Sequence, residues 1–150
     1  MTSNATRATG AIAAALIVAA PFVALREGKS NDPYFDTVGV ATVCFGETNV
    51  PMRHYSDAEC KAMLDRSLAS YGAAVLKCTP GIADRPRVTA AAISLSYNIG
   101  AAAYCRSTAA RLFNAGRIAD GCRAFMLWNR PPEIVRRRAK ERDLCLSGAI

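Results

Sequence analysis

The sequence contains a single histidine, His54, among its 150 residues. A zinc hydrolase needs two or three imidazole or equivalent ligands, and no Cys-x-x-Cys pair is present to replace them. A Ser-His-Asp or Cys-His site would have to use His54 alone. A Gly-rich phosphate-binding loop of either common type is also missing, which argues against nucleotide chemistry. These absences predict that the protein uses no metal and no cofactor, and they leave carboxylates as the expected reactive groups.

Acidic residues are few beside the basic ones. The 12 Asp and Glu face 19 Lys and Arg, which gives a formal net charge of +7 and a pI near 9.4. A basic surface suits nucleic acid, anionic lipid or an anionic cell-wall polymer, although it also serves solubility. Aromatic residues make up only 7% of the chain and are not interleaved with the basic ones in the manner of a base-stacking platform. We therefore expect no nucleic-acid partner.

Charge is missing altogether from residues 8–25, a stretch of 18 residues between Arg7 and Arg26. Roughly 20 apolar residues suffice for a helix that crosses the hydrocarbon core of a bilayer. Because the stretch is rich in alanine, its insertion into a membrane is only weakly favourable. An ordinary core helix would show a polar face, and this stretch has none. The pattern predicts a membrane-spanning segment over residues 1–25, followed by a separate domain over residues 26–150.

A cleavable signal peptide is the competing interpretation of the same stretch. Val18-x-Ala20 resembles a cleavage site, although Pro21 would follow the cut. Both interpretations imply export, and an even number of cysteines agrees with export, because an oxidising compartment would pair them as disulfides. The spacing alone leaves the pairing of the six cysteines open: Cys44, Cys60, Cys78, Cys105, Cys122 and Cys145.

Residues 26–150 show the pattern of a small mixed domain. The β-branched and aromatic residues between Tyr34 and Thr48 predict a short hairpin or a three-stranded sheet. Ser56 and Glu59 form a capping box that opens a helix running to about Lys77. Four further helices are expected over about residues 86–98, 107–114, 118–128 and 131–146. One small sheet followed by about five helices is an α+β arrangement.

Three residues at the start of this domain suit the cleavage of a glycosidic bond. That reaction needs a proton donor on one side of the bond and a group that positions or activates water on the other. Glu27, Asp36 and Thr42 follow one another in an E-x8-D-x5-T pattern. Taken alone the pattern is weak, because such triples are common among solvated surface residues.

The motifs around these residues make the pattern specific. In chain order they are Glu27-Gly28, Tyr34-x-Asp36, Gly39-x-x-Thr42-Val43-Cys44-x-Gly46-x-Thr48, Asp57-Ala58-Glu59-Cys60, Tyr97-Asn98-Ile99-Gly100, Cys105-Arg106-Ser107-Thr108, Asn114-Ala115-Gly116, Trp128 and Arg136-Arg137-Arg138-x-x-Glu141. Through these motifs, residues 26 to about 146 resemble the phage lysozyme family, glycoside hydrolase family 24. More narrowly, they resemble its signal-anchor-release endolysins.

The resemblance implies a lysozyme-like fold and a muramidase activity. Glu27 would be the general acid, and Asp36 and Thr42 would position the attacking water, which gives hydrolysis with inversion. The substrate would be the glycan strands of peptidoglycan, cleaved at the β-1,4 bond between N-acetylmuramic acid and N-acetylglucosamine. The resemblance also implies the disulfides Cys44–Cys60, Cys78–Cys105 and Cys122–Cys145.

One segment departs from the family pattern. The family carries a longer, Gly-rich loop between the tryptophan and the arginine run, whereas here Trp128 is followed directly by Asn129-Arg130-Pro131-Pro132-Glu133. By matching residue types, we expect Arg138 to pair with Glu27, with Arg137 as the second choice. Tyr34 is expected in the cleft wall, and Asn98 is expected to end its helix and satisfy local backbone groups, with contact to the substrate as the alternative.

The resemblance also predicts a location. The N-terminus would lie inside the host cell, residues 8–25 would cross the inner membrane, and the domain would lie in the periplasm, as a monomer once released. Two other functions remain open at this point. The domain could be a catalytically silent module that binds peptidoglycan, or the chain could be a small cationic protein that disrupts membranes through residues 8–25.

Overall fold

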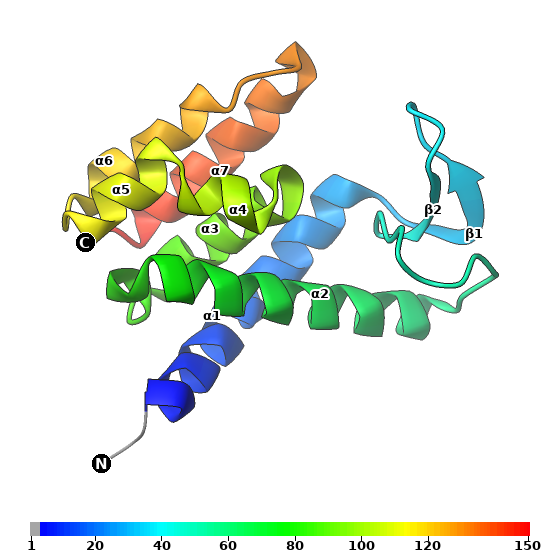
Figure 1. Ribbon diagram of the computed structural model, residues 1–150, viewed down its shortest axis with the longest axis horizontal. Helices are drawn as coiled ribbons and strands as arrows, with labels where there is room; N and C mark the ends of the chain where they lie inside the picture. The colour runs from blue at the N-terminus through cyan, green and yellow to red at the C-terminus, as the bar shows by residue number, and fades with distance from the viewer. Residues whose placement is uncertain (1–3) are drawn as a thin grey trace.

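The computed structural model describes residues 4–150, which form a group of helices with one small sheet at one end (Figure 1). Within this range the long elements are α1 (Asn4–Glu27), α2 (Asp57–Cys78), α3 (Pro86–Ile99) and α7 (Val135–Ser147). The short ones are β1 (Ser30–Phe35), β2 (Ala41–Cys44), α4 (Ala101–Cys105), α5 (Thr108–Asn114) and α6 (Ile118–Arg123). Three 3₁₀ turns connect the helices, at Pro80–Ile82, Ala124–Leu127 and Pro132–Ile134.

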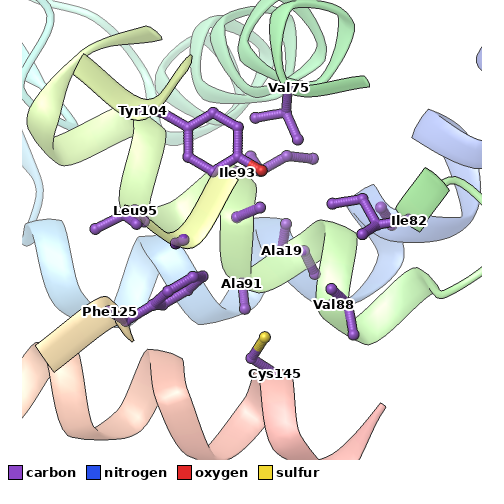
Figure 2. Close-up of a cluster of buried hydrophobic side chains, with 14 of the residues drawn as sticks. Ala19, Val75, Ile82, Val88, Ala91, Ile93, Leu95, Tyr104, Phe125 and Cys145 are labelled. Atoms are coloured by element: carbon purple, nitrogen blue, oxygen red, sulfur yellow. The ribbon is translucent and has the colours of Figure 1, made fainter. Parts of the chain in front are cut away.

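Helix α3 is the centre of the fold. Every residue from Val88 to Ser96 is buried, as expected for a helix that is apolar or small on all sides. It packs against α1, α2 and α7, and its alanines leave room for the larger side chains of its neighbours (Figure 2). Two of its buried hydroxyls are paired: that of Thr89 donates to the carbonyl of Ile82 at 2.8 Å, and that of Ser94 donates to Glu141.

Helix α1 packs one narrow face of small side chains onto α2 and α3. Ala15, Ala19 and Val23 recur every four residues on this face and are completely buried. The opposite face is exposed but still apolar, with Ile17 and Leu25 left 79% and 83% accessible. A soluble amphipathic helix would place charged residues there. Over Arg7–Glu27 the helix is also long and apolar enough to cross a membrane.

The antiparallel hairpin of β1 and β2 lies beyond the C-terminal end of α1 (Figure 1). Tyr34 pairs with Thr42 across it, and an isolated bridge joins Val43 to Glu47. The predicted hairpin is therefore present with two strands, although it starts at Ser30. The structure forms the capping box at the start of α2, where the Ser56 hydroxyl accepts from the backbone N–H of Glu59.

The predicted helices correspond to α2, α3, α5, α6 and α7. Two predicted ranges were too long, because 118–128 ends as a 3₁₀ turn after Arg123 and 131–146 begins as one at Pro132. The sequence analysis did not predict the short helix α4, which begins directly after Gly100. The φ of Gly100 is +93°. A residue in that left-handed region separates α3 from α4, so the two run as distinct helices.

Three disulfides join elements that are distant in sequence, and their pairing is the one that the family resemblance implies. Cys44–Cys60 ties the end of β2 to the first turn of α2. Cys78–Cys105 ties the end of α2 to α4, and Cys122–Cys145 ties α6 to α7. The first bridge therefore fixes the hairpin to a helix, and each of the other two fixes two helices to each other.

Candidate active site

Glu27 is the last residue of α1, and its carboxylate is turned toward α7. Its Oε1 accepts from the Nη1 of Arg137, and the two side chains are only 19% and 10% accessible. Arg137 is in turn held by Glu141, at 3.4 Å from its Nε, and by the carbonyl of Ser94 on α3. A charge-assisted bond between two largely buried groups fixes the orientation of the Glu27 carboxylate.

The arginine that contacts Glu27 is Arg137, so the expectation of Arg138 was wrong. Successive residues of an α-helix point about 100° apart, so Arg137 and Arg138 leave α7 in different directions, although both contact Glu141. Arg138 is buried on the inner side of α7, where it pairs with Glu141 and donates to the carbonyl of Trp128 at 2.9 Å. The carbonyl of Trp128 thus anchors Arg138, and Arg137 is left for Glu27.

Asn98 supports this arrangement from the end of α3. Its Oδ1 accepts from the Nη2 of Arg138, so the side chain binds a buried guanidinium rather than the end of its own helix. The backbone N–H of Gly100 caps α3 instead, by donating to Ser96. Asn98 also lines the cavity that contains Glu27. Asn98 therefore both supports Arg138 and forms part of the cavity wall.

That cavity has a volume of about 360 Å³ and lies where the end of α1, the turn after β2, α2 and α3 meet. Ligand sites in proteins are typically about 300–1,000 Å³, so the cavity is large enough for a small polar group. Most of its lining side chains carry hydroxyl, amide or carboxyl groups. They belong to Glu27, Glu47, Thr48, Asn49, Ser67, Tyr71, Tyr97 and Asn98, with Gly46 between them.

Tyr97 links the floor of the cavity to the hairpin. Its hydroxyl donates to the carbonyl of Phe45 at 2.6 Å, and its ring meets Tyr71 edge-on at a centroid distance of 5.4 Å. Burial, followed by the negative charges of Glu47 and Glu27, raises the pKa of Tyr97 well above its usual range. Tyr97 therefore stays protonated at neutral pH and keeps the turn after β2 attached to α3.

Asp36 and Thr42 lie on the hairpin, and neither is among the residues that line this cavity. The Asp36 Oδ1 accepts from the backbone N–H groups of Val38 and Val40, at 2.9 and 2.8 Å, in a tight turn. The Thr42 hydroxyl is nearly buried and donates to the carbonyl of Val40 at 2.9 Å. The structure thus joins these two residues to each other through one turn and leaves Glu27 in a separate cavity.

Tyr34 stands on β1 directly opposite Thr42 and is 44% accessible. Directly paired residues project to the same face of a sheet, so Tyr34 and Thr42 share one side of the hairpin.

His54 is exposed in the loop before α2, where its Nδ1 lies 2.8 Å from Asp32. Within residues 4–150, three or more His, Cys, Asp or Glu side chains nowhere gather so that they could hold a metal ion.

Glu47 is the acidic cavity residue that the sequence analysis did not predict. It follows Gly46, which has a φ of +87° and whose added Cβ would lie 3.7 Å from the Oε2 of Glu27. The sequence shows a glycine followed by an acid, but the direction of the Glu47 side chain depends on the left-handed backbone at Gly46.

Comparison with known proteins finds similarity to phage lysozymes and to SAR-endolysins. A model of the phage lysozyme family matches residues 24–141. The chain is 37% identical over 132 residues to the SAR-endolysin of Bacteriophage PS119, covering 81% of this chain and 77% of that protein. It is also 37% identical over 132 residues to the SAR-endolysin of Enterobacteria phage P21, covering 81% and 78%.

Solved structures show the same fold. The active form of the P1 phage endolysin Lyz superposes with a TM-score of 0.78 at 21% identity, covering 91% of this chain and 85% of that one. The endolysin from Escherichia coli O157:H7 phage FAHEc1 also gives a TM-score of 0.78, at 23% identity, covering 85% and 90%. The arrangement of hairpin and helices is therefore lysozyme-like.

Proposed function

The chain belongs to the phage lysozyme family, and we propose that it is an endolysin that hydrolyses peptidoglycan with Glu27 as its general acid. The observation that carries the proposal is the position of Glu27. Its carboxylate is held by Arg137 at the edge of a polar cavity, where hydroxyl and amide groups can bind a sugar. The bond cleaved is the β-1,4 linkage between N-acetylmuramic acid and N-acetylglucosamine.

The reaction requires Glu27 to carry its proton when the glycan is bound and to transfer it to the glycosidic oxygen as the bond breaks. We infer that Asp36 and Thr42 position the water that attacks the anomeric carbon, with inversion of configuration. Because neither residue lines the Glu27 cavity in this structure, this role requires the hairpin to bring them opposite Glu27 when the glycan is bound. Their shared turn supports this role, because the Asp36 carboxylate and the Thr42 hydroxyl are fixed by the same backbone segment at Val40.

The N-terminal helix gives the enzyme its location. Residues 8–25 span the host inner membrane with the N-terminus inside, and the domain over residues 26–150 lies in the periplasm. Later the segment leaves the bilayer and packs onto α2 and α3, and the released protein is a monomer. The uncharged sequence and the small buried face of Ala15, Ala19 and Val23 support this, because the same helix suits lipid and a close protein contact.

The anchored protein is inactive in this proposal. Glu27 lies two residues beyond Leu25, so it sits at the level of the lipid headgroups while the segment spans the membrane. The remaining walls of the cavity come from α2, α3 and the turn after β2. Glu27 joins them only when α1 packs against those helices, so release from the membrane and assembly of the site are one event.

Lysis should be delayed when the helix is made more hydrophobic on its exposed face. We expect Gly10→Leu with Ala13→Leu to hold the protein in the membrane, since each leucine favours insertion by about 0.3–0.6 kcal/mol. Both residues are exposed in the packed form, whereas a leucine at the buried Ala15 would also disrupt the core. The measurement is the lysis time of induced cells, with membrane and soluble fractions assayed together.

The matched control is Gly10→Ser with Ala13→Ser, which changes the same positions without adding apolar area and should not delay lysis. If the exported protein instead begins near Pro21 and is active at once, residues 8–25 are a cleaved signal peptide. That result would contradict the proposed release of an intact chain.

The proposed activity is tested by clearing of permeabilised Gram-negative cells with the purified full chain. Binding to the cells without clearing would favour the silent peptidoglycan-binding module. Clearing that persists in a folded Glu27→Gln variant would favour a protein that disrupts membranes through its apolar helix. We expect clearing by the wild-type chain, accompanied by new reducing ends in the glycan.

A further inference from the structure

A second carboxylate, that of Glu47, lines the cavity together with Glu27. Neither the catalytic pattern of Glu27, Asp36 and Thr42 nor the proposed mechanism gives it a role. Within residues 4–150, Glu47 forms no ion pair with a lysine, an arginine or the histidine, whereas Glu27 is paired with Arg137. A half-buried carboxylate without a cationic partner keeps a strong capacity to accept hydrogen bonds from a ligand.

The backbone holds Glu47 firmly in place. Its N–H donates to the carbonyl of Val43, and its carbonyl accepts from the N–H of the same residue, both at 2.9 Å. Cys44, the next residue along from Val43, is tied to α2 by its disulfide. The position of Glu47 is thus set by a backbone bridge and a covalent link rather than by a free loop, as binding groups in rigid sites are.

The side chain of Glu47 is also oriented. Its Oε1 accepts from the hydroxyl of Ser67 on α2 at 2.7 Å. An ionised carboxylate has about four acceptor positions, and Ser67 uses one of them. Because Glu47 lines the cavity, hydroxyl and N–H donors of a bound molecule can reach its remaining acceptor positions.

Both carboxylates line the same cavity as Tyr97. Both of their charges act on its hydroxyl, and that hydroxyl is occupied by the carbonyl of Phe45. Tyr97 therefore cannot donate its proton to Glu47 while it holds the turn. A molecule in the cavity that brings its own donors can use the acceptor positions of Glu47 that Ser67 leaves open.

We propose that Glu47 is a positioning residue that accepts hydrogen bonds from hydroxyl or acetamido N–H groups of the sugar bound beside Glu27. This rests on the proposed glycoside hydrolysis. Glu47 takes no part in proton transfer to the glycosidic oxygen. It fixes the sugar ring so that this oxygen faces Glu27, with Ser67 keeping the carboxylate in the required rotamer.

Binding can be measured without activity. In a Glu27→Gln background, a soluble, purified disaccharide-repeat fragment of peptidoglycan is titrated into the full chain by calorimetry. Adding Glu47→Gln should weaken its binding by about 10- to 100-fold, the size expected for loss of hydrogen bonds to a charged acceptor. The matched control is Asp84→Asn, which removes one negative charge from an exposed turn and should leave binding unchanged.

Two further variants separate positioning from folding. With Glu27 restored, Glu47→Gln should raise KM for the fragment while its melting temperature stays near that of the wild-type chain, because the amide oxygen can still accept from Ser67. Ser67→Ala removes the hydrogen bond from Ser67 to Glu47 but keeps the carboxylate, so it should give a smaller loss of affinity for the fragment. Equal affinity of the single and the double variant for the fragment would overturn the role of Glu47. If the Glu27→Gln chain binds no fragment at all, the proposed substrate fails instead.

Discussion

Replacing Glu27 with glutamine is expected to abolish hydrolysis of peptidoglycan while leaving the fold intact. The amide has the same shape as the carboxyl group but cannot donate an acidic proton to the leaving oxygen. General acid catalysis is typically worth about 10²–10⁴-fold, and more when the leaving group is poor. The measurement is the rate at which purified sacculi release reducing ends.

The structure makes this substitution a clean test. Glu27 lies at the end of a helix and not in its core, and Arg137 keeps its contacts with Glu141 and Ser94 when Glu27 is neutral. The matched control is Glu133→Gln, the same chemical change in an exposed 3₁₀ turn, which should retain activity. A folded Glu27→Gln chain with near wild-type hydrolysis would remove Glu27 from the mechanism.

Reduction of the three disulfides is expected to lower the stability of the domain greatly. The bridges span 16, 27 and 23 residues, and closing loops of this size stabilises a protein by about 3 kcal/mol each. A whole domain has a free energy of unfolding of only about 5–15 kcal/mol. The melting temperature in strong reductant should therefore fall by tens of degrees or the transition should vanish.

Single bridges should differ in their effect on activity. The Cys44–Cys60 bridge fixes the strand that leads into Gly46 and Glu47, so Cys44→Ser with Cys60→Ser should reduce hydrolysis more than its loss of stability explains. The matched control is Cys122→Ser with Cys145→Ser, which opens a bridge between α6 and α7 outside the cavity. For the reduction of all three bridges together, an unchanged melting temperature in strong reductant would show that the bridges do not stabilise the fold.

Local sequence signals predicted the long helices well. The capping box at Ser56 and Glu59 starts α2, and the apolar run after Pro86 forms the buried helix α3. Both signals act within one or two turns of the chain, so they are readable without knowledge of the fold. Helix α4 escaped because five residues are too few to show a periodic pattern.

The site was harder to predict because it depends on rotation and on turns. Arg137 and Arg138 are adjacent and identical in type, and only the orientation of α7 decides which one meets Glu27. Glu47 reaches the cavity through the left-handed glycine before it, whereas the Asp36 carboxylate is used within its own turn. Neither outcome can be obtained from residue spacing, since both follow from backbone angles in three dimensions.

The N-terminal helix shows how one sequence can suit two environments. Its lack of a polar face predicted a membrane segment, and the structure places the same residues against α2 and α3. Alanine on the buried face allows the close approach, and the apolar residues left exposed, such as Ile17 and Leu25, are compatible with a membrane segment. A helix selected only for a soluble core would not keep that second apolar face.

The most direct test of the proposed activity is to identify the new reducing end in digested peptidoglycan. Purified sacculi are incubated with the full chain, treated with borohydride and hydrolysed, so that each new reducing sugar is converted to its alcohol. Cleavage after N-acetylmuramic acid, with Glu27 as the acid, predicts muramitol, and none in the Glu27→Gln variant. Glucosaminitol in its place, or equal muramitol from the variant, would contradict the account.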